Sequence, residues 1–310
     1  MRIGCTTKII IGVVLLLLFI VALVFGPLGS AVFKTTTPDF MNIHKPEVSL
    51  PSEPIIHLSF FTITNTLIAA WITIILLLVI FYFATRKMTL IPGGLQNFAE
   101  FVVESLSSFI RSVAGDKHVP TFLPLVGTIF LFVVTNAWMG LLPIFGTIGV
   151  YEGHALVPIF RAANTDLNLT LSIALIAFVF VEYLGIKAYG AGHYISGFFK
   201  VDPLVWGIKQ LFKGKVVAFL KGLFMGCINI FIGLIEVLSH LIRIVSFSFR
   251  LFGNMTAGEL LILVITYLLA FVVPVVFYGL ELFFGFIQAL IFASLTLVFG
   301  SIALSAHSEE

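Results

Sequence analysis

The sequence predicts an all-α polytopic membrane protein with about six hydrophobic helices and one amphipathic helix at the membrane interface. Of 310 residues, 60% are hydrophobic and only 10% are charged, against about 25% in soluble domains. The apolar residues form long unbroken runs, unlike the short alternating segments of a transmembrane β-barrel. The 17 basic and 15 acidic residues nearly balance, so no basic face for binding nucleic acid is expected.

Residues 1–60 are predicted to form an N-terminal hydrophobic segment followed by an outer loop. The apolar run Ile9–Gly26 is either a signal peptide or a retained anchor. Gly29-Ser30-Ala31 would suit cleavage, whereas a membrane-embedded remainder favours retention. Residues 27–60 are polar and contain five prolines, which predicts an extended loop.

Residues 61–310 are predicted to form the main membrane domain. Its first three spans are expected at Leu67–Ala84, Leu123–Leu142 and Leu169–Lys187. An amphipathic helix before the second of these is indicated by apolar residues at steps of three and four, which suggests a helix lying in the interface. These residues are Phe98, Phe101, Val102, Leu106, Phe109, Ile110 and Val113. Residues 143–168 and the basic segment 188–221 are expected to be loops.

The longest apolar stretch, Gly222–Val273, contains no proline. As one helix it would be about 78 Å long, whereas the hydrocarbon core of a bilayer is about 30 Å thick. It is therefore either two spans or one steeply tilted helix. A last span is expected at Tyr278–Ser305, before a polar tail that begins at His307.

The distribution of Lys and Arg predicts the orientation in the membrane. With the N-terminus inside, twelve basic residues face the cytoplasm and three face outwards, as the positive-inside rule favours. A single crossing by Gly222–Val273 also puts the C-terminus inside. The cytoplasmic residues are Arg2, Lys8, Arg86, Lys87, Arg111, Lys117, Lys187, Lys200, Lys209, Lys213, Lys215 and Lys221; the outer ones are Lys34, Lys45 and Arg161.

Several charged residues fall inside apolar runs, where each costs about 2.5–3.5 kcal/mol to insert. Four polar residues at intervals of seven form one stripe along the long run, because seven residues return to nearly the same helix face. These are Asn229, Glu236, Arg243 and Arg250, with His240 and Asn254 four residues from two of them. Glu259 projects to the opposite side. In the last span, Glu281 and Gln288 share a face.

This arrangement suits proton transfer. Arg250 lies near the middle of the membrane, Glu236 nearer the cytoplasm, and Glu259 and Glu281 nearer the outside. Carboxylates held partly away from water can take up and release protons, whereas an arginine keeps its proton and blocks a continuous proton wire.

Other polar positions have more than one interpretation. Glu236 and Arg243 are either functional or a structural ion pair. His240 is either a proton relay or a satisfied polar residue. For Glu182, snorkelling or pairing with Lys187 is favoured over transport.

The segment Ser248-Phe249-Arg250-Leu251-Phe252-Gly253-Asn254-Met255-Thr256-Ala257-Gly258-Glu259-Leu260 resembles the signature of subunit a of bacterial-type F-type ATP synthases. The resemblance extends over roughly residues 55–310 and includes Asn164–Thr170 and Phe286–Phe292. It implies that residues 222–305 form a long tilted helical hairpin against a ring of c subunits. It also implies peripheral-stalk b subunits, a multi-pass location in the cell inner membrane and no cofactor, metal or catalytic residue, the ATP chemistry being on other subunits.

The same resemblance implies roles for individual residues. Arg250 matches the arginine that faces the ring carboxylate, and Asn254 matches its polar neighbour. Glu259, Glu281 and Gln288 match the outer half-channel, and Glu236 matches the cytoplasmic one. Protons are then the favoured transported ion, with sodium as the alternative, because ring ligands absent from this chain make that choice. Well-known bacterial members have His where this chain has Glu281.

Two other classes of function compete with this interpretation. A secondary transporter acting alone would need a substrate pocket, usually built from repeats and broken helices, and none is visible in the sequence. An intramembrane enzyme would need a catalytic motif, and no H-E-x-x-H, G-x-S-x-G or Walker-type loop occurs.

Overall fold

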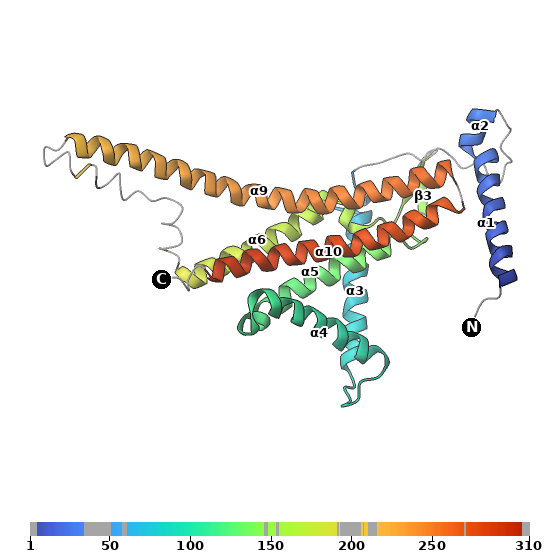
Figure 1. The fold of residues 1–310 in the computed structure, drawn as a ribbon, viewed down its shortest axis with the longest axis horizontal. Coiled ribbons are helices and arrows are strands. Elements are labelled where there is room, and N and C mark those ends of the chain that lie inside the picture. Colours follow the sequence, from blue (N-terminus) through green and yellow to red (C-terminus); the bar gives the residue numbers. More distant parts are fainter. Residues whose placement is uncertain are drawn as a thin grey trace. The chain divides into compact units, whose positions relative to one another are not determined.

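The computed structural model describes residues 5–33, 51–57, 61–145, 148–152, 155–190, 192, 206, 208–209, 216–269 and 271–305. Within this part of the chain, six helices are long and apolar enough to cross a membrane, which confirms the predicted polytopic, all-α class. They are α1 Cys5–Phe25, α3 Asn65–Thr85, α5 Val119–Gly140, α6 Leu167–Tyr189, α9 Val216–Leu268 and α10 Val273–Ser305 (Figure 1).

The expected outer loop contains more regular structure than predicted. Pro27–Phe33 forms the short helix α2, and β1 Pro54–His57 pairs antiparallel with β2 Thr62–Thr64. A proline opens both α2 and β1, and the first residue of a helix or strand is where proline is tolerated. Gly29-Ser30-Ala31 lies within α2.

The amphipathic segment forms α4 Gly94–Ala114, followed by a 3-10 turn, η2 Asp116–His118. Leu106 and Ile110 on its apolar face are buried, whereas Phe98 and Phe101 are exposed. The apolar face is therefore divided between contact with the protein and a surface open to the surroundings. Its position in the interface remains a prediction.

The segment expected to be a loop at 143–168 contains a second hairpin, in which β3 Gly149–Glu152 pairs antiparallel with β4 Ala155–Pro158. It ends in the 3-10 turn η3 Ala163–Thr165. These strands have only four residues each, too few for a periodic hydrophobic pattern to identify them.

The longest apolar stretch is one helix rather than two spans. Helix α9 has 53 residues and begins at Val216, so the predicted loop 188–221 was wrong over its last six positions (Figure 1). Helix α10 begins five residues before the predicted Tyr278 because Pro274 occupies its first turn, where no backbone N–H is needed. Most of the segment 188–215 and the tail from His307 lie outside the described residues, as do Arg2, Lys34 and Lys45.

The chain divides into two compact units. Unit 1 contains Met1–Gln96, Phe130–Leu167 and Leu251–Ile291, and unit 2 contains Asn97–Ile129, Asn168–Arg250 and Phe292–Glu310. This division does not test the predicted boundary between residues 1–60 and 61–310, which stays a prediction.

A buried polar network ties α3, α5 and η3 together in unit 1. Asn136 donates through Nδ2 to Thr73 Oγ1 at 2.9 Å and accepts from the backbone N–H of Asn164 at 3.0 Å. The Asn164 amide nitrogen also donates to the carbonyl of Val133 at 3.0 Å. Thr73, Asn136 and Asn164 have no exposed surface, and these bonds satisfy polar groups that water cannot reach; the Asn164 Oδ1 atom alone among them has no hydrogen-bond partner in the described residues.

Aromatic and small residues pack unit 2. Phe122 contacts Phe180 edge-on with ring centroids 5.8 Å apart, and Phe247 contacts Phe292 at 5.3 Å. A Cβ at Gly300 would clash with the ring of Phe122, so glycine permits this close approach.

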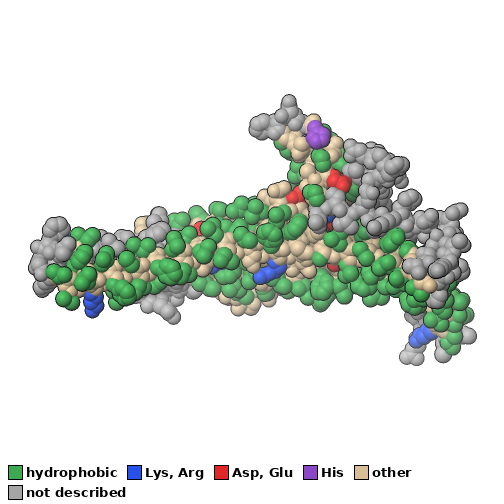
Figure 2. Space-filling view, turned by 90° about the horizontal axis from the view of Figure 1, so that it is seen from above, with side chains coloured by type: hydrophobic (Ala, Val, Ile, Leu, Met, Phe, Trp, Pro, Cys, Tyr) green, Lys and Arg blue, Asp and Glu red, His purple; other side chains and the backbone are tan. Residues whose placement is uncertain are grey.

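Hydrophobic side chains cover most of the face seen in Figure 2, with charged groups as scattered spots, as expected of a lipid-facing surface.

Candidate functional site

A cavity of about 370 Å³ in unit 1 brings the two outer carboxylates to one place. It is lined by Glu259 from α9 and Glu281 from α10, together with Arg161 and Thr165. Tyr267, Tyr278, Phe145 and Phe160 also line it. The cavity therefore combines acidic groups with aromatic walls between α9 and α10 in this unit.

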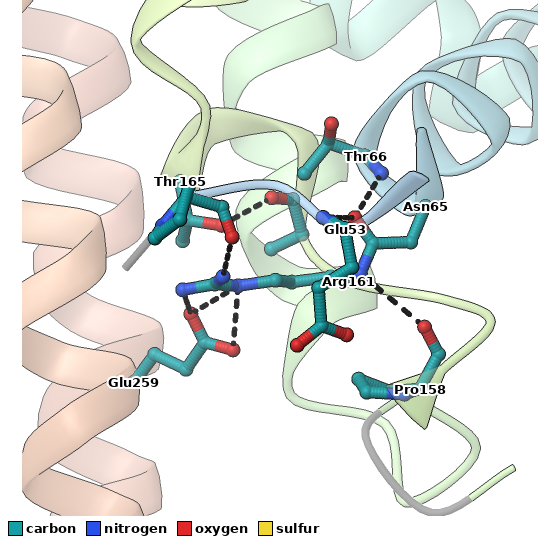
Figure 3. A network of polar contacts seen from close by, with 9 residues as sticks. Glu53, Asn65, Thr66, Pro158, Arg161, Thr165 and Glu259 are labelled. Carbon is teal, nitrogen blue, oxygen red and sulfur yellow. Dashed lines mark hydrogen bonds and ion pairs between the residues drawn. The ribbon is translucent and has the colours of Figure 1, made fainter. Parts of the chain in front are cut away.

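Glu259 is held by Arg161. The Nε atom of Arg161 donates to both carboxylate oxygens of Glu259, at 3.2 and 3.1 Å, and Nη2 lies 3.1 Å from Oε2 (Figure 3). Arg161 is 6% exposed and Glu259 is 37% exposed. A guanidinium that reaches both oxygens fixes the orientation of the carboxylate as well as balancing its charge.

The segment before α3 and the end of β4 hold Arg161 in place. Its Nη1 atom donates to the carbonyl of Pro51 at 3.2 Å. Nearby, Asn65 at the start of α3 accepts from the backbone N–H groups of Glu53 and Thr66 and donates to the carbonyl of Pro158 (Figure 3). Asn65 thus joins residues 51–53 to β4, three residues before Arg161.

Glu281 is buried but has no arginine partner comparable to Arg161 in the described part of the chain. It is 8% exposed and lines the same cavity. Its carboxylate lies so close to Gly258 that a Cβ at this position would clash with it. The indole nitrogen of Trp138 on α5 donates to the carbonyl of the next residue, Leu282, at 3.0 Å. These contacts fix the position of Glu281 relative to α9 and α5.

Gln288 is two turns further along α10 and is 5% exposed. Its Nε2 atom is buried and has no hydrogen-bond partner among the described residues. A buried amide without a partner is uncommon and marks a place where a water molecule or a neighbouring subunit can supply an acceptor. Asn254 on α9 is partly buried.

In unit 2 the polar stripe on α9 contains both exposed residues and a residue that contacts another helix. Arg250 and Glu236 are exposed. No ion pair joins Glu236 to Arg243 in the described part of the chain, so the structural pairing considered for them is not formed. The Arg243 guanidinium carbon instead lies 3.8 Å from the centre of the Phe299 ring, a cation–π contact.

The expected pairing of Glu182 with Lys187 is wrong. Oε1 of Glu182 lies 2.6 Å from Nδ1 of His240. Four residues separate Glu236 from His240 on α9, and the contact with α6 holds His240 at 18% exposure. His240 is therefore a polar residue with a specific partner.

A comparison with known proteins identifies the family. Residues 67–301 match the family described as ATP synthase A chain. The chain belongs to this family. It is also 33% identical over 246 residues to the ATP synthase subunit a of Gloeobacter violaceus, which covers 79% of this chain and 86% of that protein. The A chain family belongs to the membrane sector, Fo, so the chain is a multi-pass component of an ion-transporting ATP synthase complex.

Two residues of this A chain were given too small a role by the sequence. The sequence predicts Arg161 only as an outward-facing charge, and Glu182 as a residue that either snorkels or pairs with Lys187. Arg161 is 98 residues from Glu259, and Glu182 is 58 residues from His240. The available signal was an arginine just before the motif that begins at Asn164, and a lone carboxylate in an otherwise apolar span.

Proposed function

We propose that this chain forms the stator proton path of Fo, with two half-channels that deliver protons to and from the c-ring. The observation that carries the proposal is the cavity lined by Glu259 and Glu281. A passage in which carboxylates lie partly away from water can exchange protons with the outside. Membership in the ATP synthase A chain family also supports this proposal.

The outer half-channel runs through the cavity in unit 1. A proton enters from outside and is exchanged at Glu281 and Glu259. It then passes towards the c-ring near Gln288, whose buried amide has no partner in the described residues. There it neutralises a carboxylate on the ring, which then rotates into the lipid.

Arg250 separates this route from the cytoplasmic one. Its exposed position on α9 is compatible with contact to a partner subunit. Because a guanidinium keeps its proton, it attracts the deprotonated ring carboxylate without passing the proton itself. Asn254, one turn further along, is its polar neighbour, and Glu236 takes the released proton towards the cytoplasm.

The remaining assignments follow from this role. The chain is a non-catalytic subunit, and ATP chemistry is carried by other subunits. The c-ring and the peripheral-stalk b subunits are its partners, protons rather than sodium ions are its cargo, and no cofactor is required. Residues 61–310 carry the path, and both termini face the cytoplasm of a cell with this complex in its inner membrane.

Substitution of Arg250 tests the proposal. In the purified, reconstituted complex, Arg250→Ala is expected to abolish coupled ATP synthesis and ATP-driven proton pumping while assembly remains largely intact. Lys187→Gln removes one positive charge from an exposed position on α6 and serves as the matched control. Wild-type synthesis rates in Arg250→Ala would refute the proposal.

Two further observations distinguish a stator subunit from a secondary transporter. Co-purification with a ring of small hairpin subunits is expected for a stator subunit. Solute uptake by the chain reconstituted alone would instead support a transporter that acts without partners.

A further inference from the structure

Unit 2 contains a carboxylate–imidazole pair that the proposed proton path does not use. Glu182 on α6 and His240 on α9 approach to 2.6 Å between Oε1 and Nδ1, and each side chain is 18% exposed. A contact of this length between a carboxylate and an imidazole nitrogen is a strong, charge-assisted hydrogen bond when one partner is ionised. His240 lies four residues from Glu236 on the polar side of α9, and Glu182 approaches it from α6.

The surroundings hold the imidazole in a defined orientation. The ring of Phe178 on α6 meets the His240 ring edge-on, with centroids 6.1 Å apart and an interplanar angle of 83°. One turn further along α9, Arg243 is anchored on Phe299 of α10. Both α6 and α10 therefore contact this part of α9 within unit 2.

Within the residues that the structure describes, few other charged groups lie on the helix segments around the pair. On α9 they are Glu236, one turn before His240, and Arg243, one turn after it. On α6, Lys187 is exposed and five residues from Glu182, which places it on a different face of the helix. The α10 segment Phe292–Ser305 has no ionisable side chain. Glu236 and Arg243 are thus the charged groups closest to His240 along α9.

The geometry decides which atom exchanges a proton. An ionised carboxylate only accepts hydrogen bonds, so Nδ1 of His240 carries a hydrogen towards Glu182 whether the ring is neutral or protonated. The proton that is gained or lost is therefore on Nε2. Binding it changes the net charge of the pair from −1 to 0, because the added positive charge lies beside the Glu182 carboxylate.

We propose that Glu182 and His240 together form a proton-binding site on the cytoplasmic half-channel, next to Glu236. The inference rests on the proposed function and adds a group to it. Residues four apart on a helix are about 6 Å apart at their Cβ atoms, so His240 neighbours Glu236, and it lies about 15 Å from Arg250 along α9. During pumping, Nε2 takes a proton from the cytoplasmic water and passes it to Glu236, while Glu182 balances the positive charge of the imidazolium.

The test uses the complete ATP synthase in inverted membrane vesicles, where the medium contacts the cytoplasmic half-channel. ATP-driven proton uptake is measured as the pH of the medium is varied. In Glu182→Gln, the pH of half-maximal pumping is expected to shift, because the imidazole loses the carboxylate that contacts it. In His240→Gln the corresponding step in the pH profile is expected to disappear. The double variant should then resemble His240→Gln, since Glu182 acts through the imidazole.

Two further variants separate this role from a structural one. Lys187→Gln also removes one charge from α6, and it should leave the pH profile unchanged. The exchanged pair Glu182→His with His240→Glu restores the same two groups and should recover a titrating step. An unchanged pH profile in His240→Gln, or an equal loss of pumping at every pH in both single variants, would overturn the proposal. Arg250→Ala tests the underlying function separately, because it is expected to remove pumping at all pH values.

Discussion

Glu259 and Glu281 line one cavity but are held in different ways. Glu259 forms an ion pair with the nearly buried Arg161. Glu281 is itself more deeply buried and is fixed mainly by the packing of α10. Two neighbouring acidic groups with unlike partners are expected to respond differently to proton uptake. Proton uptake by Glu259 would disrupt its ion pair with Arg161, whereas Glu281 makes no such contact among the described residues, so Glu281 is the better candidate for proton exchange.

Substitution of Glu281 is expected to cause a partial loss of function. In Glu281→Gln, proton flux should fall by less than the roughly hundredfold loss typical of removing a required acid–base group, because Glu259 remains in the cavity. Flux is measured as proton uptake by reconstituted vesicles. A flux equal to that of the wild type would remove Glu281 from the path.

Substitution of Arg161 should affect both stability and flux. Arg161→Gln leaves Glu259 without its charge partner and the carbonyl of Pro51 without its donor, at a cost of about 1–3 kcal/mol. Thermal unfolding of the purified complex measures this loss. Arg161→Lys should recover only part of it, because an ammonium group cannot match the geometry of the guanidinium. Unfolding of Arg161→Gln at the wild-type temperature would contradict the structural role.

Much of the residue-level pattern could be predicted from periodicity. The seven-residue interval predicted that Glu281 and Gln288 share a face of α10, and both side chains are buried at 8% and 5% exposure. The partners of Glu259 and Glu182 could not be predicted in the same way. They come from segments far away in the chain, and helical spacing gives no information on which helices meet.

At the scale of elements, the absence of proline from Gly222–Val273 was informative. Without a helix-breaking residue, the run folds as the single helix α9. The two short hairpins were missed because four-residue strands owe their structure to pairing, as in the register Val150 with Val157, rather than to a local pattern. The tilt of α9 remains a prediction.

The close approach of α9 and α10 in unit 1 depends on Gly258. In Gly258→Ala, the added methyl group would meet the Glu281 carboxylate and force a shift, at a cost typical of overpacking, about 1–3 kcal/mol. We expect lower proton flux and lower thermal stability. Gly279→Ala is the matched control on α10, since a Cβ there meets nothing within 4 Å. Equal behaviour of the two variants would show that this contact does not position Glu281.

For the molecule as a whole, composition was sufficient to predict the class of protein but not its partner subunits. The high apolar content and long runs predicted a multi-pass protein, and six helices of the described chain meet that expectation. The proposed partners, the c-ring and the b subunits, are separate chains. The role proposed for exposed groups such as Arg250 therefore depends on contacts that the sequence of one chain does not specify.

The orientation predicted by the basic residues can be tested directly. A protease-cleavable tag after the C-terminus should be cut in inverted vesicles and protected in right-side-out vesicles, because the excess of Lys and Arg places that end inside. A tag placed between β3 and β4 is expected to give the opposite pattern. Cleavage of the C-terminal tag from the outer side would reverse the assignment of the half-channels.

The amide network of Thr73, Asn136 and Asn164 has a consequence for biogenesis. A helix that enters lipid with a bare asparagine carries an unmet polar group, which costs free energy until a partner arrives. Since α3, α5 and the η3 turn each contribute one of the three residues, none of them reaches its lowest free energy alone. Docking of the η3 turn thus supplies the donor for Asn136 Oδ1 on α5, and a chain truncated before Asn164 is expected to leave this acceptor unpaired within the membrane.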